Sequence, residues 1–386
     1  MFGKAGTIVR PKLPYTHLLL AVVAVFVLTA RAYGSSTPCN AAFAPETNKS
    51  FGWQGADAAY SIPLPDGRDV WIFGDTLYGT HRVVEGNNPQ MVHNSVGIST
   101  CNGGHWKLRY SLRHDDKGNP VSFFSPADPA HWYWALDGFY ANGDLWVTLL
   151  CIRHPAASAP GGMDFETCGS DLAQISGLNR DPQHWHVTVH PLVPDGVKAY
   201  PSATTVVDNG YAYLFASYEN GTRPLLVTRI PLAGLNDPAA HLEYLGNDDA
   251  WHPGFDPANA KQVMAQGSSE LSIRYHPELK KWLAVSFDPA TFSDRIILRT
   301  APDLTGPWTE PHDAATLYRV PELQAGPKHD KNIFCYAGKE HPELEVPGDI
   351  VFTYVCNTFS PPELTTRPEI YLPQVIREPM MPTASR

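Results

Sequence analysis

Five acidic residues have types and spacings suited to acid–base chemistry. Asp57 and Asp75 lie 18 residues apart, and the same spacing separates Glu270 from Asp288. A turn signal lies between the two members of each pair, so the acids of a pair would be near neighbours at the open end of an antiparallel hairpin. Asp137 is placed at the corresponding end of another predicted hairpin. The five carboxylates are therefore expected to face one opening.

Carboxylates gathered in a concave, partly desolvated site are what glycoside hydrolysis requires. One stays ionised as a base or nucleophile, and another is kept protonated to donate to the leaving oxygen. Asp57 and Asp75 are the strongest catalytic candidates because apolar residues flank both. Glu270 and Asp137 are further catalytic candidates. An acid beside a turn more often caps a backbone amide, and we interpret Asp66 and Asp144 in that way.

Aromatic and polar side chains could supply the surface that binds a sugar. Trp and Tyr faces pack against sugar C–H groups and leave the hydroxyls free to bond. Trp71, Trp146 and Trp282 lie inside predicted strands and are expected in the core. The predicted substrate-binding residues are Trp53, Tyr60, His93, Asn94, Trp134, Asp288 and His341.

A repeated hairpin must position these residues. The segments 69–75, 144–150, 211–217, 281–287 and 349–355 read as strands, and each follows a tight turn. Gly67 and Gly143 are 76 residues apart, Gly143 and Gly210 are 67 apart, and the 138 residues from Gly210 to Gly348 hold two further steps. Asn-Gly and Asp-Gly turns are strong hairpin signals. A repeat of about 70 residues that contains four strands is typical of a propeller blade.

These repeats predict an all-β protein with the fold of a five-bladed β-propeller, in one domain spanning residues 51–386. A β-sandwich with accidental periodicity is the alternative. In a propeller the first strand of each blade lines a central channel, and the open ends of the first hairpins meet at one mouth.

The beginning of the chain predicts export. Lys4, Arg10 and Lys12 precede an apolar run over 18–30, so residues 1–32 read as a signal peptide and 33–50 as an N-terminal extension. The run is shorter than the roughly 20 residues that span a bilayer. We expect a secreted monomer, extracellular or periplasmic, with no membrane anchor once the signal is removed.

The charge of the chain argues against a nucleic-acid partner. Residues 1–32 carry four positive and no negative charges, so their removal moves the net charge from −10 to −14. Phosphate binding needs a basic stripe, whereas an acidic surface is compatible with a neutral polysaccharide.

Six cysteines in an exported chain predict three disulfides. Short loops favour Cys151 with Cys168 and Cys335 with Cys356, which leaves Cys39 for Cys101, although 15 connectivities exist. The cysteine spacings match no zinc pattern. We expect no cofactor and assign no metal ligands, although the carboxylates would also allow a structural Ca²⁺ in the channel.

Several segments resemble a known family. Residues 53–67, 70–76 and 93–95, with 268–282 and 298–308, are similar to a bacterial family of endo-D-arabinanase-type glycoside hydrolases, formerly a domain of unknown function. The resemblance runs from about Phe51 to about Pro361. It implies a five-bladed β-propeller that hydrolyses D-arabinofuranose linkages in mycobacterial-type cell-wall arabinan, with Asp57 and Asp75 as the catalytic pair.

Two other functions are compatible with the sequence. A non-catalytic glycan-binding propeller would use its carboxylates to hold sugar hydroxyls, because fold does not fix function. An exo-acting furanosidase or a sialidase-like hydrolase is the other alternative. Sialidase-like hydrolysis would need an arginine cluster to hold the substrate carboxylate, and Arg153, Arg274 and Arg299 form no evident triad. Whether the cleavage inverts or retains configuration depends on a carboxyl separation that a sequence does not give.

Overall fold

The computed structural model describes residues 37–380, except 83, 86–87, 157–163, 291–292, 327–328 and 368. The predicted signal peptide lies outside the described residues. Within the described part, the regular secondary structure is mostly β-strand, and the one α-helix is the single turn α1 (Glu363–Thr366). No helix among the described residues is long and apolar enough to span a membrane.

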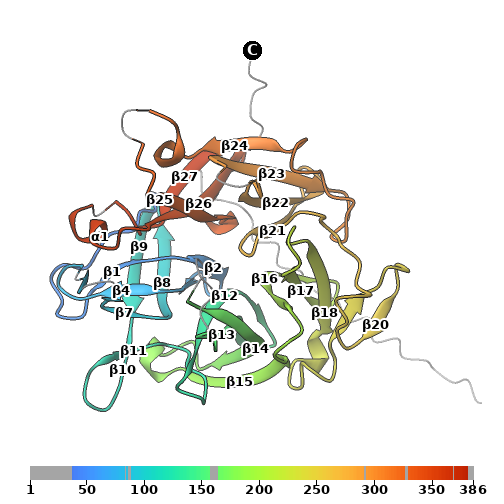
Figure 1. Cartoon of the computed structure of the whole chain (residues 1–386), viewed down its shortest axis with the longest axis horizontal. Helices are drawn as coiled ribbons and strands as arrows, with labels where there is room; N and C mark the ends of the chain where they lie inside the picture. Colours follow the sequence, from blue (N-terminus) through green and yellow to red (C-terminus); the bar gives the residue numbers. More distant parts are fainter. Residues whose placement is uncertain are drawn as a thin grey trace, which may run out of the picture. The chain divides into compact units, whose positions relative to one another are not determined.

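Five antiparallel sheets follow one another along the chain, and in each the main strands pair in chain order (Figure 1). The first sheet contains β2 (Tyr60–Pro63), β3 (Asp69–Phe73), β8 (Ser95–Asn102) and β9 (His105–Ser111). The second contains β12 (His131–Ala141), β13 (Asp144–Arg153), β14 (Glu166–Ser176) and β15 (His186–Val193). The third contains β16 (Ala199–Asp208), β17 (Tyr211–Tyr218), β18 (Leu225–Pro231), β19 (Glu243–Leu245) and β20 (Trp251–Pro253).

The fourth sheet contains β21 (Ser272–His276), β22 (Lys281–Phe287), β23 (Arg295–Ala301) and β24 (Ala315–Arg319). The fifth has three strands, β25 (Ile333–Glu340), β26 (Asp349–Thr358) and β27 (Gln374–Pro379). Short strands β1 (Trp53–Ala56), β4 (Thr76–Tyr78) and β7 (Met91–Val92) form a small sheet beside the first. Two further two-stranded pairs are β5 (Val84–Glu85) with β6 (Asn88–Pro89) and β10 (Arg113–His114) with β11 (Pro120–Val121).

The hairpin turns form as their sequences predict. Asn142-Gly143 and Asn209-Gly210 are two-residue turns between directly paired strands. All four residues have positive φ, which Asn and Gly adopt at low cost. Gly67 and Gly348 also have positive φ in the corresponding turns of the first and fifth sheets. The five predicted hairpins are therefore present.

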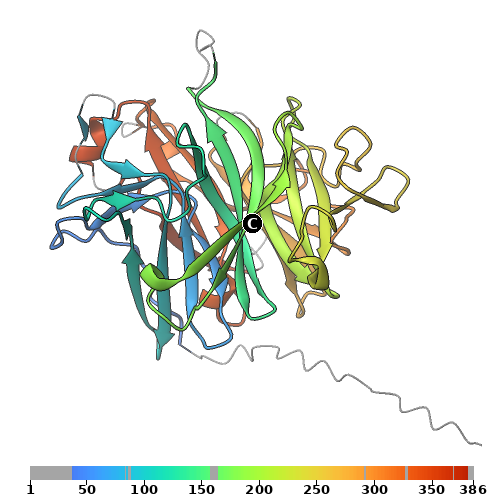
Figure 2. The ribbon, with the colours of Figure 1, turned by 90° about the horizontal axis from the view of Figure 1, so that it is seen from below.

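The first strands of successive sheets contact one another. The contacts join β2 to β12, β12 to β16, β16 to β21, and β21 to β25. Hydrogen bonds from Tyr336, Lys339 and His341 reach the segment 57–61, which brings the fifth sheet back against the first. Figure 2 shows the first three sheets from the side, with their long strands running in the same general direction.

Apolar clusters lie between neighbouring sheets. Inner strands such as β3 and β13 are buried on both faces, and Trp71 and Trp146 on them are almost completely buried, whereas the outer strands β9 and β15 keep exposed positions. One cluster packs Ile72 of the first sheet against Val147 of the second. Another packs Trp71 against Val351 of the fifth. The core tryptophans were predicted correctly, and Trp282 is also buried.

Candidate active site

Asp57 lies in the short connection between β1 and β2, and the backbone there is unusual. Ala58 and Ala59 both have positive φ, at 60° and 53°. Non-glycine residues in this region are uncommon and cost free energy, so surrounding contacts must hold them. The Asp57 carbonyl accepts hydrogen bonds from the amides of Ala59 and Gly74. Two consecutive left-handed residues therefore fix the direction in which the Asp57 carboxyl projects.

Asp75 follows β3 and lies opposite Asp57, as the hairpin predicts. The Asp57 amide donates to the Asp75 carbonyl at 3.4 Å. The Asp75 carboxyl is 24% exposed, and its Oδ1 lies 3.0 Å from Nδ1 of His93. Trp134 donates its indole N–H to the same oxygen at 3.2 Å. The His93 ring and the Trp134 indole together orient the Asp75 carboxyl.

Glu270 joins this pair through a buried lysine. Lys339 on β25 donates to Oε2 of Glu270 at 2.9 Å and also to the carbonyl of Ala58. Its ammonium lies 4.2 Å from the ring centroid of Tyr60. Because Lys339 is 1% exposed and Glu270 is 16% exposed, the ion pair is shielded from water on the lysine side. One cation therefore ties Glu270 to the backbone beside Asp57.

The other two acids of the group both affect the pKa of the Asp57 carboxyl. Burial raises the pKa of Asp57 well above its usual range, and the charges of Asp75 and Glu270 raise it further. Hydrogen bonds from Tyr336 and Tyr371 act in the opposite direction without cancelling the rise. The arrangement places one carboxyl of raised pKa close to two other carboxyl groups, the kind of unequal environment that can separate acid and base roles.

Tyr336 and Tyr371 are parts of the site that the sequence did not identify. The Tyr336 hydroxyl donates to Oδ2 of Asp57 at 2.8 Å. The Tyr371 hydroxyl donates to the Asp75 carbonyl at 2.9 Å. Burial and the charge of Asp57 raise the pKa of both phenols well above the ordinary value, so both stay protonated as donors. Nothing in the local sequence around either tyrosine points to Asp57.

Asp137 does not share the opening with the other acids. It lies in an irregularity of the β12–β13 pairing and is 0% exposed. Its carboxylate accepts hydrogen bonds from the amides of Gly138 and Thr205 and from the Thr204 hydroxyl, each at 2.8 Å. Arg274 lies 3.5 Å from the same carboxylate. A carboxylate enclosed in this way binds neighbouring strands together and has no open face for a substrate.

Four of the predicted substrate-binding residues are buried and cannot touch a sugar. Trp53 stacks on Tyr110 with centroids 4.1 Å apart. The remaining three make hydrogen bonds inside the protein: Tyr60 to the Ala203 carbonyl, Asn94 to Phe124 and Tyr133, and His341 to Ser61 and Thr353. The prediction of substrate contact at Trp53, Tyr60, Asn94 and His341 is therefore corrected, because all four side chains are almost completely buried within the protein.

His93 and Trp134 remain beside the acids. The His93 ring stacks on Trp132 with centroids 4.9 Å apart and an interplanar angle of 20°. Trp134 packs edge-on against Phe165. Both reach Asp75, so they orient a carboxylate as well as offering surface to a ligand.

Asp288 lies in the connection that follows β22. It accepts hydrogen bonds from the Ala290 amide and the Ser293 hydroxyl and lies 3.3 Å from Arg295. Asp288 lines two hollows. One of about 550 Å³ is lined in part by Ser268 and Ser269, the neighbours of Glu270. The other, of about 310 Å³, is lined in part by Cys335, the neighbour of Tyr336.

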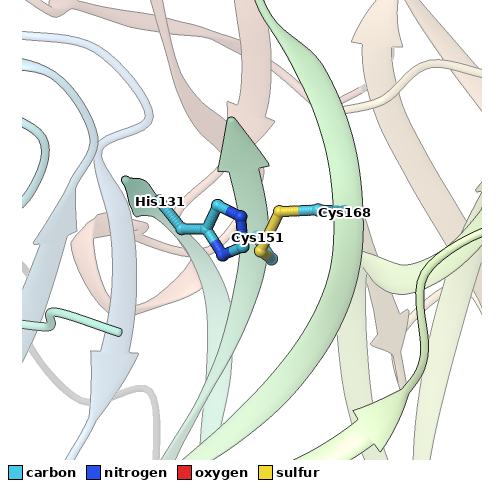
Figure 3. A group of neighbouring side chains, drawn as sticks. All are labelled: His131, Cys151 and Cys168. Atoms are coloured by element: carbon cyan, nitrogen blue, oxygen red, sulfur yellow. A yellow bond between two sulfur atoms is a disulfide. The ribbon is translucent and has the colours of Figure 1, made fainter. Parts of the chain in front are cut away.

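The three expected disulfides are present: Cys39–Cys101, Cys151–Cys168 and Cys335–Cys356. Figure 3 shows the second, with the ring of His131 beside it. His131 and these two sulfurs are close enough to hold a metal ion in principle, but disulfide sulfurs offer no thiolate.

A different group has the donor set of a cation site. His276, Glu340 and Glu345 have ligand atoms within 4.8 Å of one another. Burial opposes the His276 imidazolium, but its contacts with Glu340 and Glu278 outweigh that effect and raise its pKa to about 9. Burial, together with the charge of Glu340, raises the pKa of Glu345 to about 10. Protons therefore neutralise much of this cluster without a metal.

Comparison with known proteins identifies the family of this chain. The family described as a domain of unknown function, DUF5005, matches residues 41–374. No curated protein matches the chain. A solved structure from Bacteroides ovatus ATCC 8483, provisionally described as a hydrolase, has 19% identity and a TM-score of 0.63, and the match covers 85% of this chain and 86% of that one.

Two other solved structures are more distant. The GH43_1 enzyme from Xanthomonas citri, complexed with xylotriose, has 12% identity over 88% of this chain and 91% of that one, with a TM-score of 0.47. An endo-arabinase from Bacteroides thetaiotaomicron VPI-5482 has 12% identity over 90% of this chain and 99% of that one, with a TM-score of 0.44. The Bacteroides ovatus protein is similar to this chain in fold alone, and the other two are too distant to support a statement about activity.

Proposed function

The chain belongs to the DUF5005 family, and we propose that it is a glycoside hydrolase that cleaves a furanose-containing polysaccharide at the carboxyl groups of Asp57, Asp75 and Glu270. The observation that carries the proposal is the raised pKa of Asp57 beside two other acids. A carboxyl that keeps its proton near neutral pH can donate it to a glycosidic oxygen.

The proposed roles follow from the hydrogen-bond partners. Asp57 donates its proton to the leaving oxygen while Tyr336 holds its other oxygen. Asp75, oriented by His93 and Trp134, acts on the anomeric carbon directly or through a water molecule. Glu270, paired with Lys339, keeps negative charge close to Asp57 and so maintains its protonated form.

The proposal also includes the fold of the chain. Five sheets whose first strands contact one another in order, and whose fifth sheet returns to the first, support a five-bladed β-propeller. The three disulfides suit an oxidising compartment, which supports the expected secretion. The resemblance of residues 53–76 to endo-D-arabinanases supports D-arabinan of mycobacterial-type cell walls as the substrate.

The experiment that tests this function is release of reducing ends from purified polysaccharides. We expect the protein without residues 1–32 to cleave mycobacterial-type D-arabinan, and the Asp57→Asn variant to leave it intact. Plant-type L-arabinan and xylan serve as comparison substrates. Binding to D-arabinan without any release of reducing ends would instead identify a non-catalytic glycan-binding protein.

A further inference from the structure

Three aromatic rings form a continuous stack that starts at the candidate site. Tyr336 and Phe334 lie two residues apart on β25, with ring centroids 5.7 Å apart and an interplanar angle of 18°. Phe334 in turn stacks on Phe359, with centroids 4.5 Å apart and an angle of 29°. The inner end of the stack contacts Asp57 through the Tyr336 hydroxyl. The outer end is the ring of Phe359.

Phe359 is 69% exposed, the highest value among the large exposed hydrophobic residues of the described chain. Its loop is nevertheless held in place. The Phe359 amide donates to the Asn332 carbonyl at 2.9 Å. Glu363 accepts hydrogen bonds from the side chains of Asn332 and Thr358, both at 3.3 Å. The braced loop therefore presents an exposed ring that a ligand can reach, in line with the stack that leads to Asp57.

The hollow of about 310 Å³ lies against this stack and contains the polar groups that a sugar requires. Phe334 and Phe359 line it together with Asp288, His329 and Lys331. Aromatic faces pack against the C–H groups of a sugar, while carboxylate, imidazole and ammonium groups bond to its hydroxyls. The stack itself carries no charge, which suits a neutral chain.

From this continuity we infer that Phe359 and Phe334, with the hollow beside them, form a subsite that binds the polysaccharide away from the bond at Asp57. The inference rests on the proposed function, because one polysaccharide molecule must occupy both the subsite and the cleavage site at Asp57. The occupant is a neutral furanoside polymer. Phe359 makes the outermost contact, and Tyr336 connects the subsite to the carboxyl groups.

Chain-length dependence of binding tests the subsite. D-arabinan oligosaccharides of two to about ten sugars are titrated calorimetrically into Asp57→Asn protein, with and without Phe359→Ala. We expect two-sugar ligands to bind both proteins equally. Oligosaccharides long enough to reach the subsite should lose about tenfold in affinity in the Phe359→Ala protein, the scale of one lost aromatic contact. Phe359→Trp should restore the affinity, and Phe359→Leu should not.

A matched control removes an exposed aromatic side chain elsewhere. Tyr275 lies on β21, three residues after the first residue of that strand, and is 48% exposed. Glu270 lies outside the strand, before its first residue. Tyr275→Ala should leave the binding of every oligosaccharide unchanged. Equal affinities for long oligosaccharides with and without Phe359 would overturn the subsite.

The same titrations separate failure of the subsite from failure of the proposed function. If the wild-type protein releases no reducing ends but Phe359→Ala still weakens the binding of long oligosaccharides, hydrolysis is wrong and the subsite stands. If the wild-type protein cleaves arabinan and Phe359→Ala changes neither affinity nor KM, the subsite is wrong. Absence of both binding and cleavage would overturn both.

Discussion

The Tyr336 hydroxyl donates a hydrogen bond to Oδ2 of Asp57 at 2.8 Å, although 279 positions separate the two residues. This contact joins the first and fifth sheets at the centre of the candidate site. It also lowers the pKa of Asp57, in opposition to burial and to the charges of Asp75 and Glu270. The acidity of Asp57 is therefore set by residues from three sheets.

Asp57→Asn and Asp75→Asn should each lower kcat on a cleavable arabinan by about 10²-fold or more, the scale for loss of a positioned acid or base. The double variant should lose little beyond either single one, because residues that act as a unit are not additive. Steady-state kinetics and circular dichroism are the measurements. Near-normal turnover in Asp57→Asn, with none in Glu270→Gln, would move the acid to the fourth sheet.

Tyr336→Phe should shift the basic limb of the kcat/KM profile to higher pH. The hydrogen bond from Tyr336 lowers the pKa of Asp57, so its removal raises that pKa and keeps the acid protonated at higher pH. We expect at most about a tenfold loss of kcat/KM at the optimum, the worth of one such bond. If the basic limb of the kcat/KM profile of Tyr336→Phe stays in place or moves to lower pH, Asp57 is not the acid.

Gly74→Ala should displace the Asp57 carboxyl. A Cβ at this position would lie 2.3 Å from Oδ1 of Asp57, and real contacts do not approach so closely. A shift of about 1 Å at a reacting group can lower activity 10²-fold, and we expect a loss of that order in kcat with the fold retained. Gly326→Ala is the matched control, since a Cβ there meets no atom within 4 Å among the described residues.

The free energy of unfolding should fall as pH rises from about 5 to about 9. Burial and neighbouring charge raise the pKa of Glu345 to about 10, from 4.5 in an unfolded chain. His276, despite its burial, has its pKa raised from 6.5 to about 9 by Glu340 and Glu278. At Glu345 and His276 the folded chain thus holds more protons than the unfolded chain across this range, so these two groups stabilise the protein at low pH and lose that contribution as pH rises.

Melting temperatures measured between pH 5 and pH 9 check this sign. Glu345→Gln should flatten the dependence, because glutamine resembles the protonated acid. The control is Asp313→Asn, whose carboxylate is 71% exposed and which should melt with the slope of the wild type. An unchanged slope in Glu345→Gln would show that Glu345 is ionised in the folded protein.

The sequence by itself determined the local features. Asn142-Gly143 and Asn209-Gly210 are turns because these residue types tolerate positive φ, a preference that depends on no distant contact. Asp57 and Asp75 meet because Asp57 precedes and Asp75 follows the two strands of one hairpin, and hairpin register follows from turn position. Short loops likewise favoured the disulfide partners Cys151 and Cys168.

Only the tertiary structure decided which side chains reach the acids. Tyr336 and Lys339 come to Asp57 and Glu270 because the fifth sheet packs against the first, and no local pattern encodes that contact. Packing of the second sheet against the third encloses Asp137 among backbone and hydroxyl donors, and Trp53 is buried against Tyr110, so residues whose types suit an open site are structural here. Residue type and spacing specify where a side chain leaves its strand, whereas burial and pKa depend on neighbours hundreds of residues away.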